Sequence, residues 1–229
     1  MSEQELRQET CEIAKLFRNE EVLDEEILSR IKAMPEVIHE KLPSTANLFL
    51  ESVLEDRLEI TKVLVGMGTD IHLQCKPSLI SGNALNVAHS PEQADYLLSL
   101  GIEIEKNLVL RESFVNPAIM AVKHNDKKMM LYWLNKQKVL FSQEKEFLDA
   151  LINETIYQVT IMNQYDMLAC IIADDELYYV LKEIYTKEDD MQSIKLQLSS
   201  LRKITEEGLE EKKKELKKIL NETKKNLSM

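Results

Sequence analysis

The segment 47–71, NLFLESVLEDRLEITKVLVGMGTDI, constrains the fold of this chain most, because it has the pattern of a complete helical hairpin. Apolar residues recur at helical spacing on both sides of the polar corner 55–57. That corner is too short to let two helices separate, so we expect them to pack antiparallel. Gly68 follows the second apolar stripe, where a left-handed backbone closes a helix without a side-chain penalty. Such a hairpin has apolar surface on more than one side and needs neighbours of its own kind.

Weaker copies of this pattern follow at 82–104, 116–137 and 154–173. In the copy at 82–104, Ser90 and Pro91 predict a helix start, as N-cap and first helical residue, and Gly101 predicts its end. Gln137 stands in the next copy where the earlier ones have glycine, and no glycine closes the last. The copies begin about 33 to 38 residues apart, which is the spacing of a repeat protein built from helical hairpins.

These residues resemble the ankyrin repeat family over about Met34 to Ala173. The run 58–65 followed by 68–71 is similar to the second half of an ankyrin repeat, 83–88 to its Thr-Pro-Leu-His start, and 96–101 to its Leu-Leu-Leu-x-x-Gly end. The resemblance implies an all-α, ankyrin-like helical-hairpin solenoid. The helices expected at 3–17 and 24–34, the second with Asp24 as N-cap, would cap its first end.

Residues 1–187 would then form the repeat domain with both caps, and 188–229 a long helical, possibly coiled-coil tail. Met191 to Leu227 is helical in pattern almost throughout, with apolar residues at coiled-coil-like spacing that changes phase at Gly208. The Lys212–Lys214 run alternates with glutamates, which is typical of a solvated helical face. Self-association through Met191–Leu227 is therefore an alternative to a purely monomeric module.

The ankyrin resemblance implies a protein-binding module, an adaptor or an inhibitor that presents a concave surface of turn tips and first-helix faces. Carried over by position, the partner-binding residues would be Ser44, Ala46, Leu54, Glu55, Ser113, Val115, Lys123 and His124. A net charge of −11 argues against nucleic acid as a partner and favours a protein with a basic surface. We expect no membrane partner, because no apolar run approaches the ~18 residues needed to span a bilayer.

Other chemistry finds little support in the pattern. His72 and Cys75 have a spacing that could share a metal ion, but no second ligand pair matches them, so we interpret both as linker residues. Asp174, Asp175 and Glu176 are interpreted as the charged start of a helix. Core packing is the role expected for Met129, Met130, Met162 and Met167. We therefore predict no enzyme, cofactor or metal, and keep a metal protein or enzyme that uses His72 and Cys75 as the least favoured alternative. Three scattered cysteines and a charged N-terminus without an apolar leader indicate a cytoplasmic protein.

Overall fold

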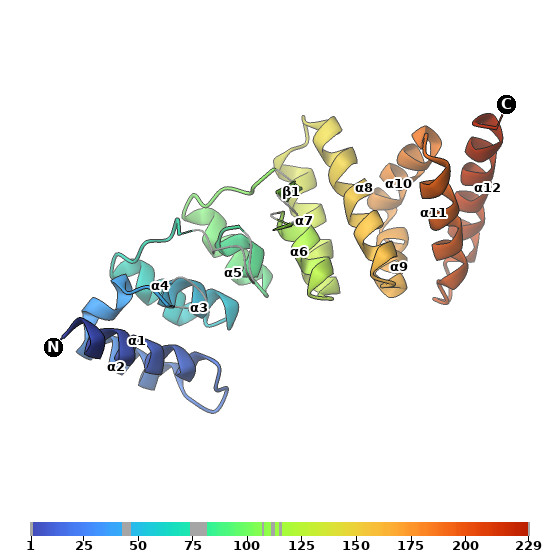
Figure 1. The fold of residues 1–229 in the computed structure, drawn as a ribbon. Helices are drawn as coiled ribbons and strands as arrows, with labels where there is room; N and C mark the ends of the chain where they lie inside the picture. The colour runs from blue at the N-terminus through green and yellow to red at the C-terminus, as the bar shows by residue number, and fades with distance from the viewer. Residues whose placement is uncertain are drawn as a thin grey trace. The chain divides into compact units, whose positions relative to one another are not determined.

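The computed structural model describes residues 2–42, 47–73, 82–106, 108–110, 113–114 and 116–228 (Figure 1). These residues form twelve α-helices, two short 3-10 helices and one pair of two-residue strands. The prediction of an all-helical protein is confirmed for the secondary structure of the described residues. The chain divides into two compact units, Met1–Pro117 and Ala118–Met229, which are described separately below.

The first unit contains α1 (Glu3–Phe17), α2 (Asp24–Ala33), η1 (Pro35–His39), α3 (Leu48–Leu54), α4 (Leu58–Gly66), η2 (Ala84–Val87), α5 (Pro91–Ser99), β1 (Val109–Leu110) and β2 (Ser113–Phe114). The two strands pair antiparallel, with Val109 opposite Phe114 and Leu110 opposite Ser113. The second unit begins within α6 (Pro117–Lys123) and continues with α7 (Lys127–Leu140), α8 (Lys145–Ile161), α9 (Tyr165–Ala173), α10 (Asp175–Lys187), α11 (Met191–Lys203) and α12 (Glu210–Asn226).

The N-terminal helix pair packs on the first hairpin, α3–α4. Ile13 and Phe17 of α1 are buried with Ile31 of α2 in one cluster, which also takes in Ile60 and Leu64 of α4. A capping box at Ser2 starts α1, because the Ser2 and Glu5 side chains each accept a backbone N–H of the other residue. The apolar surface that the hairpin cannot bury alone is thus covered on this side.

The prediction that Asp24 is the N-cap of α2 is wrong. Asp24 is the first residue of the helix, and Leu23 occupies the N-cap position without a side-chain hydrogen bond. The reason is Arg57, whose Nη1 donates to Asp24 Oδ1 at 2.8 Å and whose Nη2 donates to the Asn19 carbonyl at 2.9 Å. The carboxylate is thus used in a contact between the helix pair and the first hairpin.

Glycine closes the second helix of the first two copies, as the sequence predicts. Gly68 has φ +88° and Gly101 has φ +82°, and the residue after each donates its N–H to the carbonyl five residues back. The start of each copy is also bonded to its end. The Asn47 amide donates to the Asp70 carbonyl at 3.0 Å, and the Asn83 amide donates to the Glu103 carbonyl at 2.8 Å. Ser90 and Pro91 start α5 as expected.

The later copies depart from the predicted boundaries. The end expected at Gln137 is wrong, because α7 runs on to Leu140 and buries the Gln137 side chain completely. α8 begins at Lys145, well before 154. The carboxylate of Asp174 caps α10 by accepting the N–H groups of Glu176 and Leu177, which confirms the helix-start interpretation.

The segment 188–229 packs within the second unit. It forms two helices, α11 and α12, with Gly208 in a left-handed conformation between them. The apolar residues of both are turned inward, since Ile194, Leu201, Leu216 and Leu220 have no exposed surface. α12 lies against α10, and α11 lies against α8 and α9. The sequence placed a domain boundary at 187, whereas the structure groups 188–229 with the helices before it.

Candidate protein-binding surface

Three hairpin corners share one backbone geometry, and they position the residues expected to bind a partner. They join α3 to α4, α6 to α7 and α8 to α9. Asp56, Asn125 and Asn163 are the non-glycine residues with positive φ in the described part of the chain, at +51°, +56° and +59°. Short polar side chains tolerate this left-handed region better than other L-residues do. The next residue in each corner donates its N–H to the carbonyl five residues back, at 2.8 to 2.9 Å.

The two residues before each left-handed position are therefore structurally equivalent. In the first unit they are Leu54 and Glu55, both half-buried, with Glu55 Oε1 3.9 Å from Arg18 Nε. In the second unit one pair is Lys123 and His124, both exposed. These four were predicted from the sequence to be contact residues. The structure shows that they occupy the same place in their corners.

The other corner of the second unit carries an apolar pair that sequence reasoning missed. Ile161 is 46% exposed and Met162 is 39% exposed. The expectation that Met162 fills the core is wrong, whereas Met129, Met130 and Met167 are buried as predicted. Met162 is the C-cap of α8 and lies beyond the apolar face of the helix. Asn163 was the available signal, because an asparagine after a helix, like Asn125, is typical of a left-handed corner.

The two corners of the second unit are bonded to each other. Gln164 Nε2 donates to the Val122 carbonyl at 2.9 Å. Lys127 Nζ lies 2.9 Å from Asp166 Oδ2, and this contact raises the pKa of the lysine and lowers that of the carboxyl. The basic pair 123–124 and the apolar pair 161–162 are consequently held in a defined relation. We call these four residues the corner surface.

The remaining predicted contact residues cannot be placed on this surface. Ser44, Ala46 and Val115 lie outside the described residues. Ser113 belongs to β2, where its backbone pairs with Leu110. Cys75 also lies outside the described residues.

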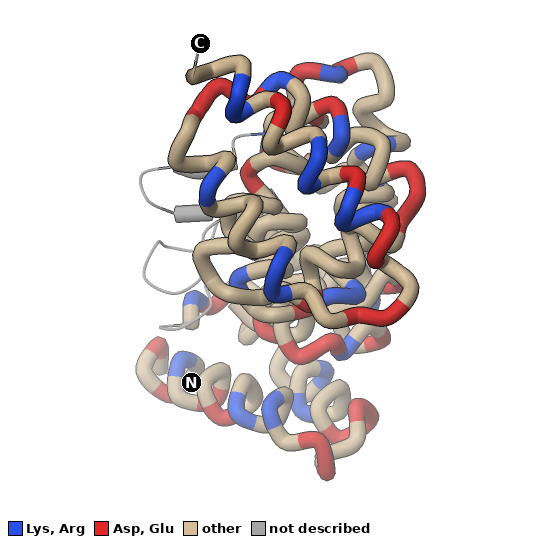
Figure 2. The backbone as a smooth tube through the Cα atoms, turned by 90° about the vertical axis from the view of Figure 1, so that its right-hand side faces the viewer, with Lys and Arg blue, Asp and Glu red and all other residues tan. Residues whose placement is uncertain are grey.

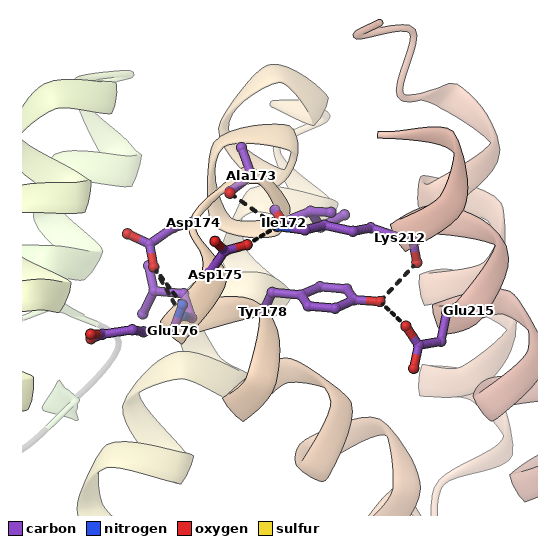
Figure 3. Close-up of polar contacts among 9 residues, drawn as sticks. Ile172, Ala173, Asp174, Asp175, Glu176, Tyr178, Lys212 and Glu215 are labelled. Carbon is purple, nitrogen blue, oxygen red and sulfur yellow. Dashed lines mark hydrogen bonds and ion pairs between the residues drawn. The ribbon is translucent and has the colours of Figure 1, made fainter. Parts of the chain in front are cut away.

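A second polar cluster attaches α12 to the junction between α9 and α10 (Figure 3). Lys212 Nζ donates to the Ile172 and Ala173 carbonyls at 3.0 and 3.1 Å and to Asp175 Oδ1 at 2.7 Å. Those carbonyls end α9 and have no partner in the helix itself. The Tyr178 hydroxyl donates to Glu215 Oε2 at 2.7 Å, and burial and then this bond raise the pKa of Tyr178. The cluster therefore satisfies helix ends and fixes α12.

The pattern of the Lys212–Lys214 run predicts a solvated helical face, and this prediction is wrong for Lys213. Lys213 is only 5% exposed, and its ammonium donates to the Ile204 carbonyl at 2.7 Å. Figure 2 shows Lys and Arg interleaved with Asp and Glu along the helices of the second unit. What this unit can bind is consequently decided by local side chains more than by net charge.

The described residues contain no group of three or more His, Cys, Asp or Glu side chains that could hold a metal ion. Cys11 and Cys170 are free, half-buried thiols, and burial raises the pKa of Cys170, which lowers its reactivity. None of the helices in the described ranges combines the length and the apolar character needed to cross a membrane. Comparisons with protein-family models, with curated proteins and with solved structures found no match to the chain.

Proposed function

We propose that this chain is an ankyrin-like helical-hairpin solenoid that binds a partner protein through its hairpin corners. The observation that carries the proposal is the corner surface, where Ile161 and Met162 are exposed in a corner that is bonded to the one carrying an exposed basic pair. The repeated corner geometry and the repeated asparagine bonds of the first two copies support an assembly of equivalent hairpins.

A corner of this kind is suited to binding for a physical reason. The left-handed residue and the bond behind it fix the backbone that carries the exposed side chains. Little ordering entropy is then lost when a partner docks, so more of the contact free energy appears as affinity. The net charge of −11 acts at longer range and favours encounter with a basic protein, whereas at the contact itself the basic pair favours an acidic group of that partner.

The test is capture of a partner from native lysate on the immobilised full chain, with the captured protein identified by mass spectrometry. The double variant Ile161→Glu, Met162→Glu should lose capture, because it places charge where an apolar contact is expected. Val139→Glu is the matched control, since Val139 is an apolar residue of α7 that is 72% exposed. Capture by the double variant at the level of the control would contradict the proposal, provided that both keep the far-UV circular dichroism of the parent.

The self-association alternative rests on the apolar residues of 191–227. In the structure Ile194, Leu201 and Leu216 are already buried against other helices of the same unit. Light scattering on the full chain decides the matter, because a monomer mass at high concentration would leave that alternative without support.

A further inference from the structure

A groove separates the exposed sides of α8 and α11 in the second unit. Its volume is about 240 Å³. Tyr157 of α8 and Leu196 of α11 line it, and they are 50% and 37% exposed. It lies outside the four residues of the corner surface.

Two residues that line this groove each have a buried oxygen atom without a hydrogen-bond partner in the described part of the chain. Thr160 and Gln197 are 3% and 5% exposed, and Thr160 Oγ1 and Gln197 Oε1 are both unpaired. The orientation of the glutamine is set by its other atom, because Nε2 donates to Glu188 Oε2 and to Ser193 Oγ, each at 3.0 Å. Buried polar atoms are nearly always paired. A donor from outside the chain, an ordered water or a peptide N–H, would satisfy this amide oxygen.

One end of the groove is acidic. Asn153 lines both this groove and a neighbouring hollow of about 250 Å³, so the two adjoin at this residue. The acidic groups that line them are Asp149, Glu154, Glu188 and Asp189, and the basic group is Lys187. Lys187 is itself 3.9 Å from Asp149. Four carboxylates against one ammonium favour a cation and disfavour phosphate-bearing ligands.

We propose that this groove binds a short peptide segment of a partner protein, with a Lys or Arg next to an apolar residue. The cation lies at the acidic end near Asp189, and the apolar side chain lies between Tyr157 and Leu196. Peptide N–H groups donate to Gln197 Oε1 and to Thr160 Oγ1. Each hollow has the size of one or two side chains and is smaller than a typical small-molecule pocket, which favours a peptide.

The probe is a fluorescein-labelled peptide, Gly-Lys-Leu-Arg-Leu-Lys-Gly, titrated with the full chain and followed by fluorescence anisotropy. Two comparison peptides replace either its basic residues by Glu or its leucines by Ser. We expect saturable binding of the first peptide alone. Tyr157→Ala and Asp189→Lys should each weaken it by about tenfold, which corresponds to about 1.4 kcal/mol.

Matched controls separate the groove from general surface effects. Tyr179→Ala removes another exposed tyrosine, 67% exposed on α10, and Glu207→Lys reverses an exposed charge in the α11–α12 loop. Both should leave the affinity unchanged. Thr160→Val should weaken binding by about fivefold without lowering the stability of the chain, because it removes a hydroxyl that bonds only to the peptide.

Three results would overturn the proposal. The first is no saturable binding of the basic, apolar peptide at millimolar protein. The second is equal binding of the serine peptide, which would show attraction to the negative chain alone. The third is an affinity that Tyr157→Ala and Asp189→Lys leave unchanged. Lys123→Glu, a change in the corner surface, should not affect this peptide, so failure here is distinguishable from failure of the corner proposal.

Discussion

Gly66 and Gly68 lie two residues apart at the end of α4, and replacing each by alanine should have opposite effects on stability. Gly66 is the last residue of the helix, whereas Gly68 has φ +88°. A Cβ added at either position meets no atom within 4 Å. The two substitutions therefore differ in backbone conformation and not in packing.

The expected magnitudes follow from that difference. Gly66→Ala replaces a poor helix residue by the best one, which should raise the free energy of unfolding by about 0.5–1 kcal/mol. Gly68→Ala places a Cβ in the left-handed region at a cost of about 1–2 kcal/mol. Reduced freedom of the unfolded chain offsets about 0.4–1 kcal/mol of that cost. The net loss is about 1 kcal/mol, so the two variants should differ by about 1.5–2 kcal/mol.

Urea unfolding followed by far-UV circular dichroism measures this difference. For a slope of about 2–3 kcal/mol per molar, the midpoints of the two variants should lie about 0.5–1 M apart, with unchanged slopes. Gly101→Ala is a third variant, because Gly101 has φ +82° and equally open surroundings. It should reproduce the loss seen for Gly68→Ala.

The reasoning is refuted if Gly68→Ala is neutral or if it shifts the midpoint in the same direction as Gly66→Ala. Either result would mean that the turn after α4 adopts another conformation at no cost. The glycine signals that define the first two copies would then have no structural basis.

Three further predictions concern the second unit. Tyr178→Phe should lower the free energy of unfolding by about 1 kcal/mol, because it removes the bond to Glu215, whereas Tyr179→Phe, at a 67% exposed neighbour, should be neutral in the same urea assay. The pKa of Tyr178 is raised above 10.0, so its contribution to stability is complete below pH 10 and is lost as the pH rises through the raised pKa. Urea midpoints measured at rising pH above 10 should fall for the parent and fall less for Tyr178→Phe. An equal fall of the midpoint in both proteins would contradict the raised pKa of Tyr178. Thr160→Val should raise the free energy of unfolding by about 1 kcal/mol, since it replaces an unpaired buried hydroxyl by a methyl, and a lower urea midpoint would show that the hydroxyl is paired.

Sequence reasoning succeeded where structure depends on local backbone chemistry. Gly68 and Gly101 close their helices in the predicted left-handed conformation, and Ser90 starts α5. Such signals act over a few residues and need no tertiary partner. The buried apolar stripe of α4 was readable for the same reason, because Ile60 and Leu64 recur at helical spacing.

It failed where a distant contact overrides a local preference. Asp24 could cap its own helix but is bonded to Arg57 instead. Gln137 is polar, yet it is buried inside α7, and the helix continues past the residue at which the predicted copy ends. Lys213 belongs to a charged run whose pattern is that of a solvated face, but its ammonium is bonded to the Ile204 carbonyl. None of these partners can be identified from spacing along the chain.

The proposed peptide groove could not have been found from the sequence either, for a related reason. Thr160 and Gln197 are ordinary helix residues in sequence, and what distinguishes them is an unpaired side-chain oxygen that is buried only after α8 and α11 have packed. Unpaired buried atoms also occur at Glu51, Gln93 and elsewhere, so one such atom carries little meaning. Two on different helices that border the same groove, beside half-exposed Tyr157, are harder to ascribe to imperfect packing. A folded chain that leaves two unpaired acceptors and an apolar wall in one place is complementary to a peptide, which supplies N–H donors and an apolar side chain.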